Sequence, residues 1–300
     1  SGLELTKERR KEVLDLRKKI VELQLAFSKN VNEQKDFALF SKEELEGLPA
    51  DFIARLEKAD GKYKVTLDYP DYYPFINNAA NAAALAQHGY VAVSINYRLS
   101  GTAPFPAAVE DCKLAVRWLR SQAARLRIDP ERIGVWGSSA GGHLALMVGC
   151  ADAAAGLEGK GIDEVSSRVQ AVCSWFGPAD FTPKTDRVGR GGNPVQLFLG
   201  GEPEEIPELY CLASPVTHVS ADDPPVLLVH GDHDPVVPLV QSETMLAALK
   251  KAGVESSLVV VKNAGHGFKP TGGEIAPSND EIRTRCVEFF DRWLKQDHEK

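Results

Sequence analysis

The chain has no long apolar run, no paired-cysteine motif and no excess of basic residues. No apolar stretch in its 300 residues approaches the ~18 residues that a membrane-spanning helix needs. A net charge of −7 argues against a nucleic acid or an anionic membrane surface as the main partner. The five cysteines include no Cys-x-x-Cys pair, and their odd number favours buried free thiols in a reducing compartment.

The sequence also has no secretion signal at its start. Residues 1–20 are charged and contain no apolar core of the kind that signal peptides carry, which predicts a cytoplasmic location. The His-Glu-x-x-His motif of zinc peptidases is absent from the whole chain.

Residues 131–145 have the pattern of a buried strand, a tight glycine-rich turn and a helix. The turn, residues 137–141, reads Gly-Ser-Ser-Ala-Gly. A reversal this tight needs positive φ and little side-chain bulk, so it exposes the hydroxyl of its central serine. The first N–H groups of the following helix favour negative charge on a substrate oxygen. Ser139 is therefore the predicted nucleophile, and the N–H of Ala140 is a predicted oxyanion donor.

An acid and a histidine follow Ser139 in the chain order that strand-turn-helix hydrolases use. Residues 225–235 form a predicted strand that runs into an acidic loop containing Asp234. Residues 257–268 form another strand, which runs into the glycine-flanked His266. We expect His266 to take and return the serine proton, and Asp234 to hold the imidazole tautomer.

The acidic loop could also be interpreted as a metal site. It gathers His230, Asp232, His233 and Asp234, whose side chains are all of metal-binding types. A strand-end acid loop already explains these residues, and no distant ligand set accompanies them, so we expect neither a metal nor a cofactor. His143, just inside the helix after Ser139, is expected to be a structural or pocket residue rather than a second base.

Strands and helices alternate after residue 79, which predicts a mostly parallel sheet with helices on both faces. Ligands bind beyond the carboxyl ends of such strands, where all three predicted catalytic residues fall. The expected strands are residues 91–96, 133–136, 169–175, 226–230 and 258–261. The expected helices lie near residues 79–88, 106–124, 140–150, 238–252 and 279–295.

Residues 178–218 are rich in glycine and proline and are too long for a simple connection. They predict a small cap over the site. Candidates to line the substrate pocket are Trp175, Phe176, Leu197 and Phe198, and ordinary core packing is an equal alternative for each.

Residues 1–78 differ in character, because they are helical and charged and end in a strand-like piece at 62–69. Apolar residues spaced three and four apart, at Val13, Leu16, Ile20, Leu23 and Phe27, form a short heptad seam. The seam could form a homodimer. Docking on the chain's own core is the favoured alternative, because a stable coiled coil needs about three or four heptads.

From residue 79 onwards the sequence resembles the α/β-hydrolase superfamily, in particular the hormone-sensitive-lipase-like and the feruloyl- or acetyl-esterase-like carboxylesterases. The blocks that carry the resemblance include ALAQHGYVAVSINYRLS, IDPERIGVWGSSAGGHLAL, DDPPVLLVHGDHDPVVP and GHGF, in family order. It implies an α/β-hydrolase domain over residues 79–300 and a small-molecule ester as substrate. It also implies Ser139 as nucleophile, His266 as base, and Asp234 rather than Asp232 as acid.

The same resemblance implies a central strand ending in His-Gly-Gly-Gly, whose N–H groups complete the oxyanion hole, and this motif is absent. In the family order that strand lies between the strands at 91–96 and 133–136, so its absence would open the centre of the sheet. Residues 63–69 could fill the gap and bring Tyr72 or Tyr73 near Ser139. Their alternating polar positions fit a central strand poorly.

Residues 18–76 resemble a non-catalytic helical segment of the thimet oligopeptidase and neurolysin family. Because the zinc motif is absent, neither zinc nor peptidase activity follows from this resemblance. The sequence as a whole predicts a serine carboxylic ester hydrolase that acts on small or medium acyl esters through an acyl-enzyme. The alternatives are a catalytically impaired or silent hydrolase-like fusion and a serine peptidase of the prolyl-oligopeptidase type.

Overall fold

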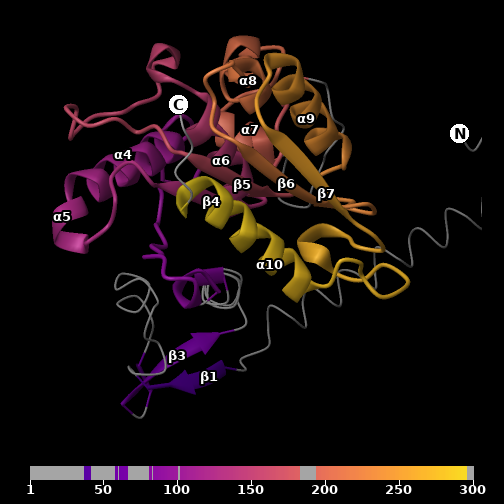
Figure 1. Cartoon of the computed structure of the whole chain (residues 1–300). Coiled ribbons are helices and arrows are strands. Elements are labelled where there is room, and N and C mark those ends of the chain that lie inside the picture. The colour runs from indigo at the N-terminus through magenta and orange to yellow at the C-terminus, as the bar shows by residue number, and fades with distance from the viewer. Residues whose placement is uncertain are drawn as a thin grey trace, which may run out of the picture. The chain divides into compact units, whose positions relative to one another are not determined.

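A computed structural model describes residues 37–41, 58–59, 61–66, 81–82, 84–100, 102–182 and 194–295. The chain folds as two compact units, Ser1–Ala83 and Ala84–Lys300 (Figure 1). The seam at residues 13–27 lies outside the described residues, and so do Tyr72 and Tyr73.

The first unit contains a small antiparallel sheet. Its strands are β1 (Phe37–Phe40), β2 (Lys58–Ala59) and β3 (Lys62–Thr66), in the order β1-β3-β2. Gly61, with φ of +75°, closes the tight turn between β2 and β3. Because β3 pairs with β1 and β2 in a separate sheet, residues 63–66 do not take the place in the hydrolase sheet that the sequence left open to them, in agreement with the poor fit of their pattern. Their alternating pattern is that of a small antiparallel sheet.

The second unit is built on four parallel strands in the order β4-β5-β6-β7. They are β4 (Gly134–Ser138), β5 (Ala171–Trp175), β6 (Val226–Gly231) and β7 (Ser256–Val261). Every residue of β5 and β6 is buried, as expected for strands covered on both faces. The four strands predicted after residue 130 are therefore present, with ends shifted by one or two residues.

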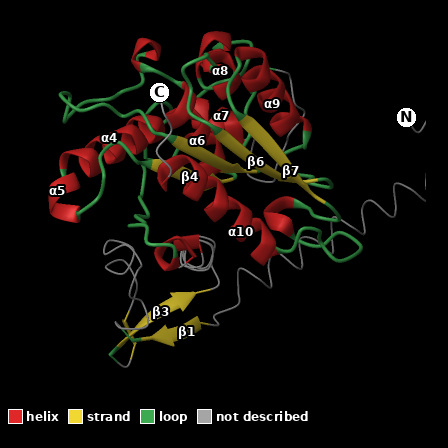
Figure 2. Ribbon diagram, in the orientation of Figure 1, coloured by secondary structure: helices red, strands yellow, loops and turns green. Residues whose placement is uncertain are grey.

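Helices cover both faces of this sheet (Figure 2). The longer ones are α4 (Ala107–Ser121), α6 (Ala140–Cys150), α9 (Val240–Ala252) and α10 (Asn279–Phe290). The shorter ones are α5 (Ala123–Leu126), α7 (Pro194–Leu199) and α8 (Pro207–Leu212). Single helical turns occur at Ala153–Ala155, Pro215–His218, His266–Phe268 and Asp291–Lys295.

Alternate residues of the central strands belong to two separate hydrophobic cores. On β6, Leu228 packs with residues of α4, α6 and α9, whereas Leu227 and Val229 pack with residues of α10. This is the period of two that a strand imposes on its side chains. Among the described helices, α10 thus lies on the opposite face from α4, α6 and α9.

The predicted strand at residues 91–96 is wrong. Residues 90–99 form neither strand nor helix, and Val91 and Val93 are 55% and 48% exposed. Among the residues that the structure describes, β4 pairs with β5 alone, and the buried indole Nε1 of Trp136 on β4 has no hydrogen-bond partner. No strand among the described residues offers residues 91–96 a ladder to join, so an apolar run with strand propensity stays irregular.

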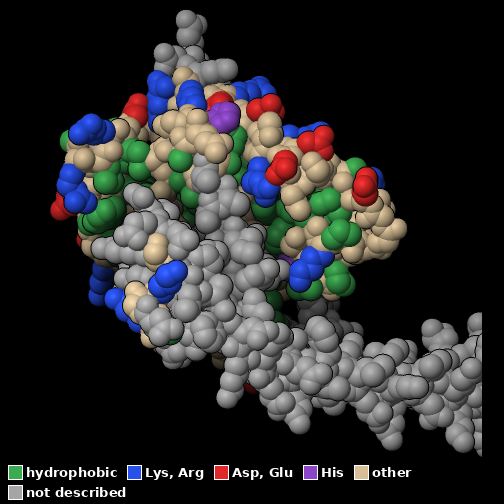
Figure 3. All heavy atoms as spheres, turned by 90° about the horizontal axis from the view of Figure 1, so that it is seen from below, with side chains coloured by type: hydrophobic (Ala, Val, Ile, Leu, Met, Phe, Trp, Pro, Cys, Tyr) green, Lys and Arg blue, Asp and Glu red, His purple; other side chains and the backbone are tan. Residues whose placement is uncertain are grey.

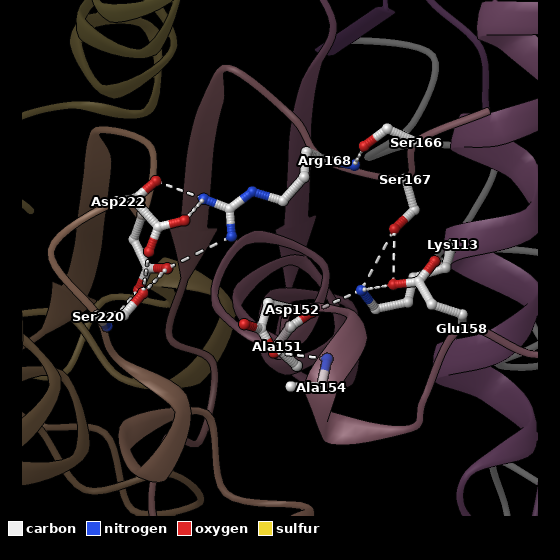
Figure 4. A network of polar contacts seen from close by, with 11 residues as sticks. Lys113, Ala151, Asp152, Ala154, Glu158, Ser166, Ser167, Arg168, Ser220 and Asp222 are labelled. Carbon is white, nitrogen blue, oxygen red and sulfur yellow. Dashed lines mark hydrogen bonds and ion pairs between the residues drawn. The ribbon is translucent and has the colours of Figure 1, made fainter.

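A buried ionic network ties α4 to the segment after α6 (Figure 4). The Nζ of Lys113 donates to Glu158 Oε1 at 2.8 Å and to the carbonyl of Ala151 at 2.6 Å. Arg117 donates to the other oxygen of Glu158 at 2.7 Å. Burial alone would raise the pKa of Glu158, but hydrogen bonds from Lys113 and Ser167 and the nearby cations lower it. One carboxylate therefore balances two buried cations.

The surface of the described part carries both signs of charge. On the face seen in Figure 3, basic and acidic side chains are interspersed rather than gathered into one large field. No helix within the described ranges combines the length and the apolar character that crossing a membrane requires.

Candidate active site

Ser139 lies at a strained turn between β4 and α6. Its φ of +53° and ψ of −119° fall outside the regions that residues with a side chain normally occupy. The turn is so close that a Cβ on Gly137 would lie 2.1 Å from the carbonyl oxygen of Gly141. Position 137 must therefore be glycine, and the serine hydroxyl stands at the carboxyl edge of the sheet, as the sequence predicts.

The start of α6 leaves one backbone donor beside Ser139. The N–H of Ser139 itself is bound to the carbonyl of Trp175 at 2.8 Å. The N–H of Ala140 has no acceptor in the first helical turn, and none of the described residues accepts from it. The N–H of Ala140 is thus free to donate to a substrate oxygen, and the positive end of the helix dipole would stabilise negative charge on that oxygen.

His266 connects Ser139 to Asp234. Its Nδ1 lies 2.8 Å from Asp234 Oδ2, and its Nε2 lies 3.0 Å from Ser139 Oγ. A carboxylate only accepts, so Nδ1 donates, and in the neutral ring Nε2 accepts the serine hydroxyl. The three residues follow β4, β6 and β7, so the parallel sheet brings together side chains that are far apart in sequence.

Asp234 is buried and held as an anion. Its Oδ1 accepts from the N–H groups of Val236 at 2.8 Å and Val237 at 2.9 Å, which leaves Oδ2 for His266. Burial alone would raise the pKa of Asp234, but the hydrogen bonds from His266, Val237 and Val236 outweigh burial and lower it. The carboxylate is ionised at neutral pH.

The other acidic and histidine side chains of this loop have different partners. Asp232 Oδ1 lies 2.7 Å from Nδ1 of His233, and its Oδ2 lies 3.6 Å from Lys262 Nζ. His230 points into the protein and contacts Ser242. Across the described ranges, no three His, Cys, Asp or Glu side chains are grouped so that they could hold a metal ion.

The four predicted pocket residues lie in different places. Phe176 packs edge-on against His266, with 4.8 Å between ring centroids, and therefore borders the site. Trp175 is buried in the core under α10, where its Nε1 contacts Cys286 Sγ at 3.2 Å. On α7, Phe198 packs against His143, and Leu197 is exposed.

His143 is a buried neutral residue. Its Nε2 donates to the carbonyl of Ala213 at 2.7 Å, and its ring lies between those of Phe181 and Phe198. Burial lowers its pKa to about 4. It links α6 to the end of the 178–218 segment.

The fold and the site together define the class of the protein. A parallel sheet covered on both faces, with a serine elbow, an acid and a histidine each following a different strand, is the α/β-hydrolase arrangement. Residues 73–249 match the BD-FAE family, and the chain belongs to that family.

Known proteins resemble stretches of the chain. Esterase LipQ of Mycobacterium tuberculosis is 30% identical over 211 residues, which are 69% of this chain and 48% of LipQ. A solved structure of a truncated carbohydrate esterase from gut microbiota has a TM-score of 0.64 and 31% identity, and it covers 72% of this chain and 78% of its own. Saccharolysin of Saccharomyces cerevisiae is 39% identical over 94 residues, 29% of this chain and 13% of saccharolysin. The chain thus spans about half the length of LipQ.

Proposed function

We propose that the chain hydrolyses carboxylic esters with small or medium acyl groups through a covalent acyl-enzyme. The observation that carries the proposal is the continuous hydrogen-bond chain from Ser139 through His266 to the ionised Asp234. The similarity to proteins named as esterases, LipQ and the gut carbohydrate esterase, supports the same chemistry.

The geometry supplies each proton transfer of the reaction. Ser139 Oγ attacks the ester carbonyl carbon while its proton passes to His266 Nε2, 3.0 Å away. The anionic Asp234 stabilises the imidazolium that forms. His266 then returns the proton to the leaving alcohol, which leaves an acyl-Ser139 ester. Water attacks this ester with His266 as base, and the carboxylic acid product leaves Ser139 free.

The oxyanion side of the site is less complete than the proton relay. Within the described residues, Ala140 offers one backbone donor beside Ser139. A missing oxyanion donor typically costs about 10²- to 10³-fold in kcat. Tyr72 and Tyr73 remain the sequence-based prediction for a second donor. We therefore expect a slow esterase.

The test is Ser139→Ala, with Ser138→Ala as its matched control. Turnover of p-nitrophenyl butyrate should fall by at least about 10⁴-fold in Ser139→Ala, because nothing replaces the nucleophile. Covalent labelling by a fluorophosphonate should disappear with it. Ser138 is the last residue of β4 and has no hydrogen bond to His266, so Ser138→Ala should still be labelled. Labelling that persists in Ser139→Ala would contradict the proposal.

One observation favours a second candidate, a catalytically silent hydrolase-like fusion. The strand that would supply further oxyanion donors is absent from the described sheet, which ends at β4. If the natural chain turns over p-nitrophenyl butyrate at the same rate as Ser139→Ala, the silent protein is the correct alternative.

A further inference from the structure

His230 is a fully buried histidine that the proposed proton relay does not use. It is the fifth residue of β6, and its side chain has no exposed surface. Buried polar rings are costly unless each nitrogen finds a partner. Both nitrogens of His230 do, and the partners lie on the two segments that follow Asp234.

The directions of these hydrogen bonds fix the tautomer of His230. Nε2 lies 2.8 Å from the carbonyl oxygen of Val237, which can only accept, so Nε2 carries the hydrogen. Nδ1 lies 2.7 Å from Ser242 Oγ. Burial lowers the pKa of His230 despite the opposing charges of Asp234 and Glu243, so the ring is neutral and Nδ1 accepts the Ser242 hydroxyl.

The Val237 residue joins His230 to Asp234. Its N–H donates to Asp234 Oδ1 at 2.9 Å, and its carbonyl accepts from His230 at 2.8 Å. His230 Nε2 is 3.6 Å from Asp234 Oδ2, too far for a hydrogen bond, so it does not compete with His266 for that oxygen. His230 thus acts on the carboxylate through the backbone of the turn.

We propose that His230 is a positioning residue of the acid loop. By holding the Val237 carbonyl, it fixes the turn from Asp234 to Val237 in the form that aims Oδ2 at His266 Nδ1. Ser242, on the first turn of α9, donates to Nδ1 and holds the imidazole in the orientation that directs Nε2 at this carbonyl. The effect of His230 on turnover rests on the proposed esterase function, whereas its effect on the His266–Asp234 hydrogen bond does not.

Two substitutions of His230 separate the hydrogen bond from the volume of the ring. Gln places an amide N–H near the position of Nε2, whereas Phe fills the space without a donor. In His230→Phe, kcat for p-nitrophenyl butyrate should fall roughly 10²-fold, because a small displacement of a catalytic group has an effect of that order. KM should not change, since His230 does not face the substrate. His230→Gln should recover most of the lost kcat.

The NMR signal of the His266 Nδ1–H proton gives a readout that does not depend on turnover. A proton shared with Asp234 resonates far downfield, and it should be present in the natural protein, in Ser139→Ala and in His230→Gln. It should be lost or shifted upfield in folded His230→Phe. If His230→Phe does not fold, Ser242→Ala takes its place, with a smaller loss of kcat, about 3- to 10-fold, expected because the orientation of the imidazole is no longer held from Nδ1.

The outcomes distinguish the two proposals. Unchanged kcat and an unchanged downfield resonance in folded His230→Phe, or in Ser242→Ala where that variant is used, would overturn the positioning role of His230. Turnover that survives Ser139→Ala, with the resonance behaving as expected, would overturn the esterase proposal and leave the positioning role in place.

Discussion

Asp234, and not the nearby Asp232, is the aspartate that contacts His266, and the difference is set at the scale of single residues. Asp232 and Asp234 lie in the same loop, and both have lowered pKa values. Only Asp234 turns inward to His266, because the N–H groups of Val236 and Val237 hold its other oxygen. Charge alone therefore does not identify the acid, whereas its backbone partners do.

The two aspartates allow a matched test. Asp234→Asn should lower kcat for p-nitrophenyl butyrate by about 10⁴-fold, because the amide no longer stabilises the imidazolium or fixes its tautomer. Asp232→Asn should reduce kcat by less than about threefold, since its contacts to His233 and Lys262 lie on the exposed side of the loop. Equal losses in both variants would show that the wrong acid has been chosen.

His143 predicts a pH dependence of stability. Its pKa is about 4 in the fold against an ordinary value near 6.5, so between these pH values the unfolded chain binds a proton that the folded chain does not. Acidification through this window therefore lowers the free energy of unfolding, by about 1.4 kcal/mol per pH unit. Between pH 6.5 and 5, the natural protein should lose about 2 kcal/mol more than His143→Gln in urea titrations. The same loss in both proteins would contradict this role.

The positions of Ser139, Asp234 and His266 could be predicted because each follows a recognisable strand in a fixed chain order. The role of Val237 and His230 could not, because it depends on a backbone carbonyl that no sequence pattern marks. Trp175 illustrates the same limit. Its position next to the site is visible in the sequence, but whether its ring faces substrate or α10 depends on the register of β5.

At the scale of elements, the elbow between β4 and α6 depends on how closely two stretches of backbone approach. A Cβ on Gly137 would meet backbone atoms of Gly141 at 2.1 Å and 2.3 Å, and backbone cannot move aside as a side-chain end can. At Gly141 a Cβ would meet no atom within 4 Å. The two glycines of the turn therefore have different physical reasons to be there.

Replacing each glycine by alanine tests this difference. Gly137→Ala should lower the free energy of unfolding by about 3 kcal/mol or more, because the elbow must open. Gly141→Ala should leave it unchanged or raise it by up to about 1 kcal/mol, since alanine favours the helix. Urea unfolding followed by tryptophan fluorescence measures both, as all four tryptophans lie in the unit Ala84–Lys300. A destabilised Gly141→Ala would contradict this explanation.

Strand prediction succeeded for the four strands that pair with one another and failed for residues 91–96. β5 and β6 are continuous apolar runs covered on both faces, so their sequence identifies them. Residues 91–96 are also rich in β-branched and other apolar residues, yet they form no strand. Strand propensity describes how well side chains fit the pleated surface of a sheet, and no described strand pairs with residues 91–96 to form such a surface.

At the scale of the whole molecule, the ionic network around Glu158 joins α4 to the segment that follows α6. Lys113 has no exposed surface and Arg117 is 3% exposed, so neither cation is stabilised by water. Both depend on the one carboxylate, whose own side chain is 29% exposed. The network holds the helix layer on one face of the sheet in place.

Removing that carboxylate should therefore be costly. Glu158→Gln should lower the free energy of unfolding by about 3 kcal/mol, the lower end of what breaking a buried ion pair costs, because Glu158 is partly solvated. Glu255→Gln is the control. Glu255 is 60% exposed and 3.7 Å from an equally exposed Arg292, so its effect should be below about 0.5 kcal/mol. Similar effects of the two substitutions would mean that the buried cations do not depend on Glu158.

Among the described residues, only β5 pairs with β4, and the edge of β4 away from β5 has a consequence for how the molecule responds to ligands. β4 carries that edge along its length and Ser139 immediately after its end. A segment that added itself to the edge would restrict the backbone that leads into the elbow, and so would a group bound covalently to Ser139. Both events would act on the same five residues of β4, Gly134–Ser138. Any coupling free energy between them would be reciprocal, so a segment that changed the affinity of the Ser139 site for a ligand would have its own affinity for the edge changed by the same factor.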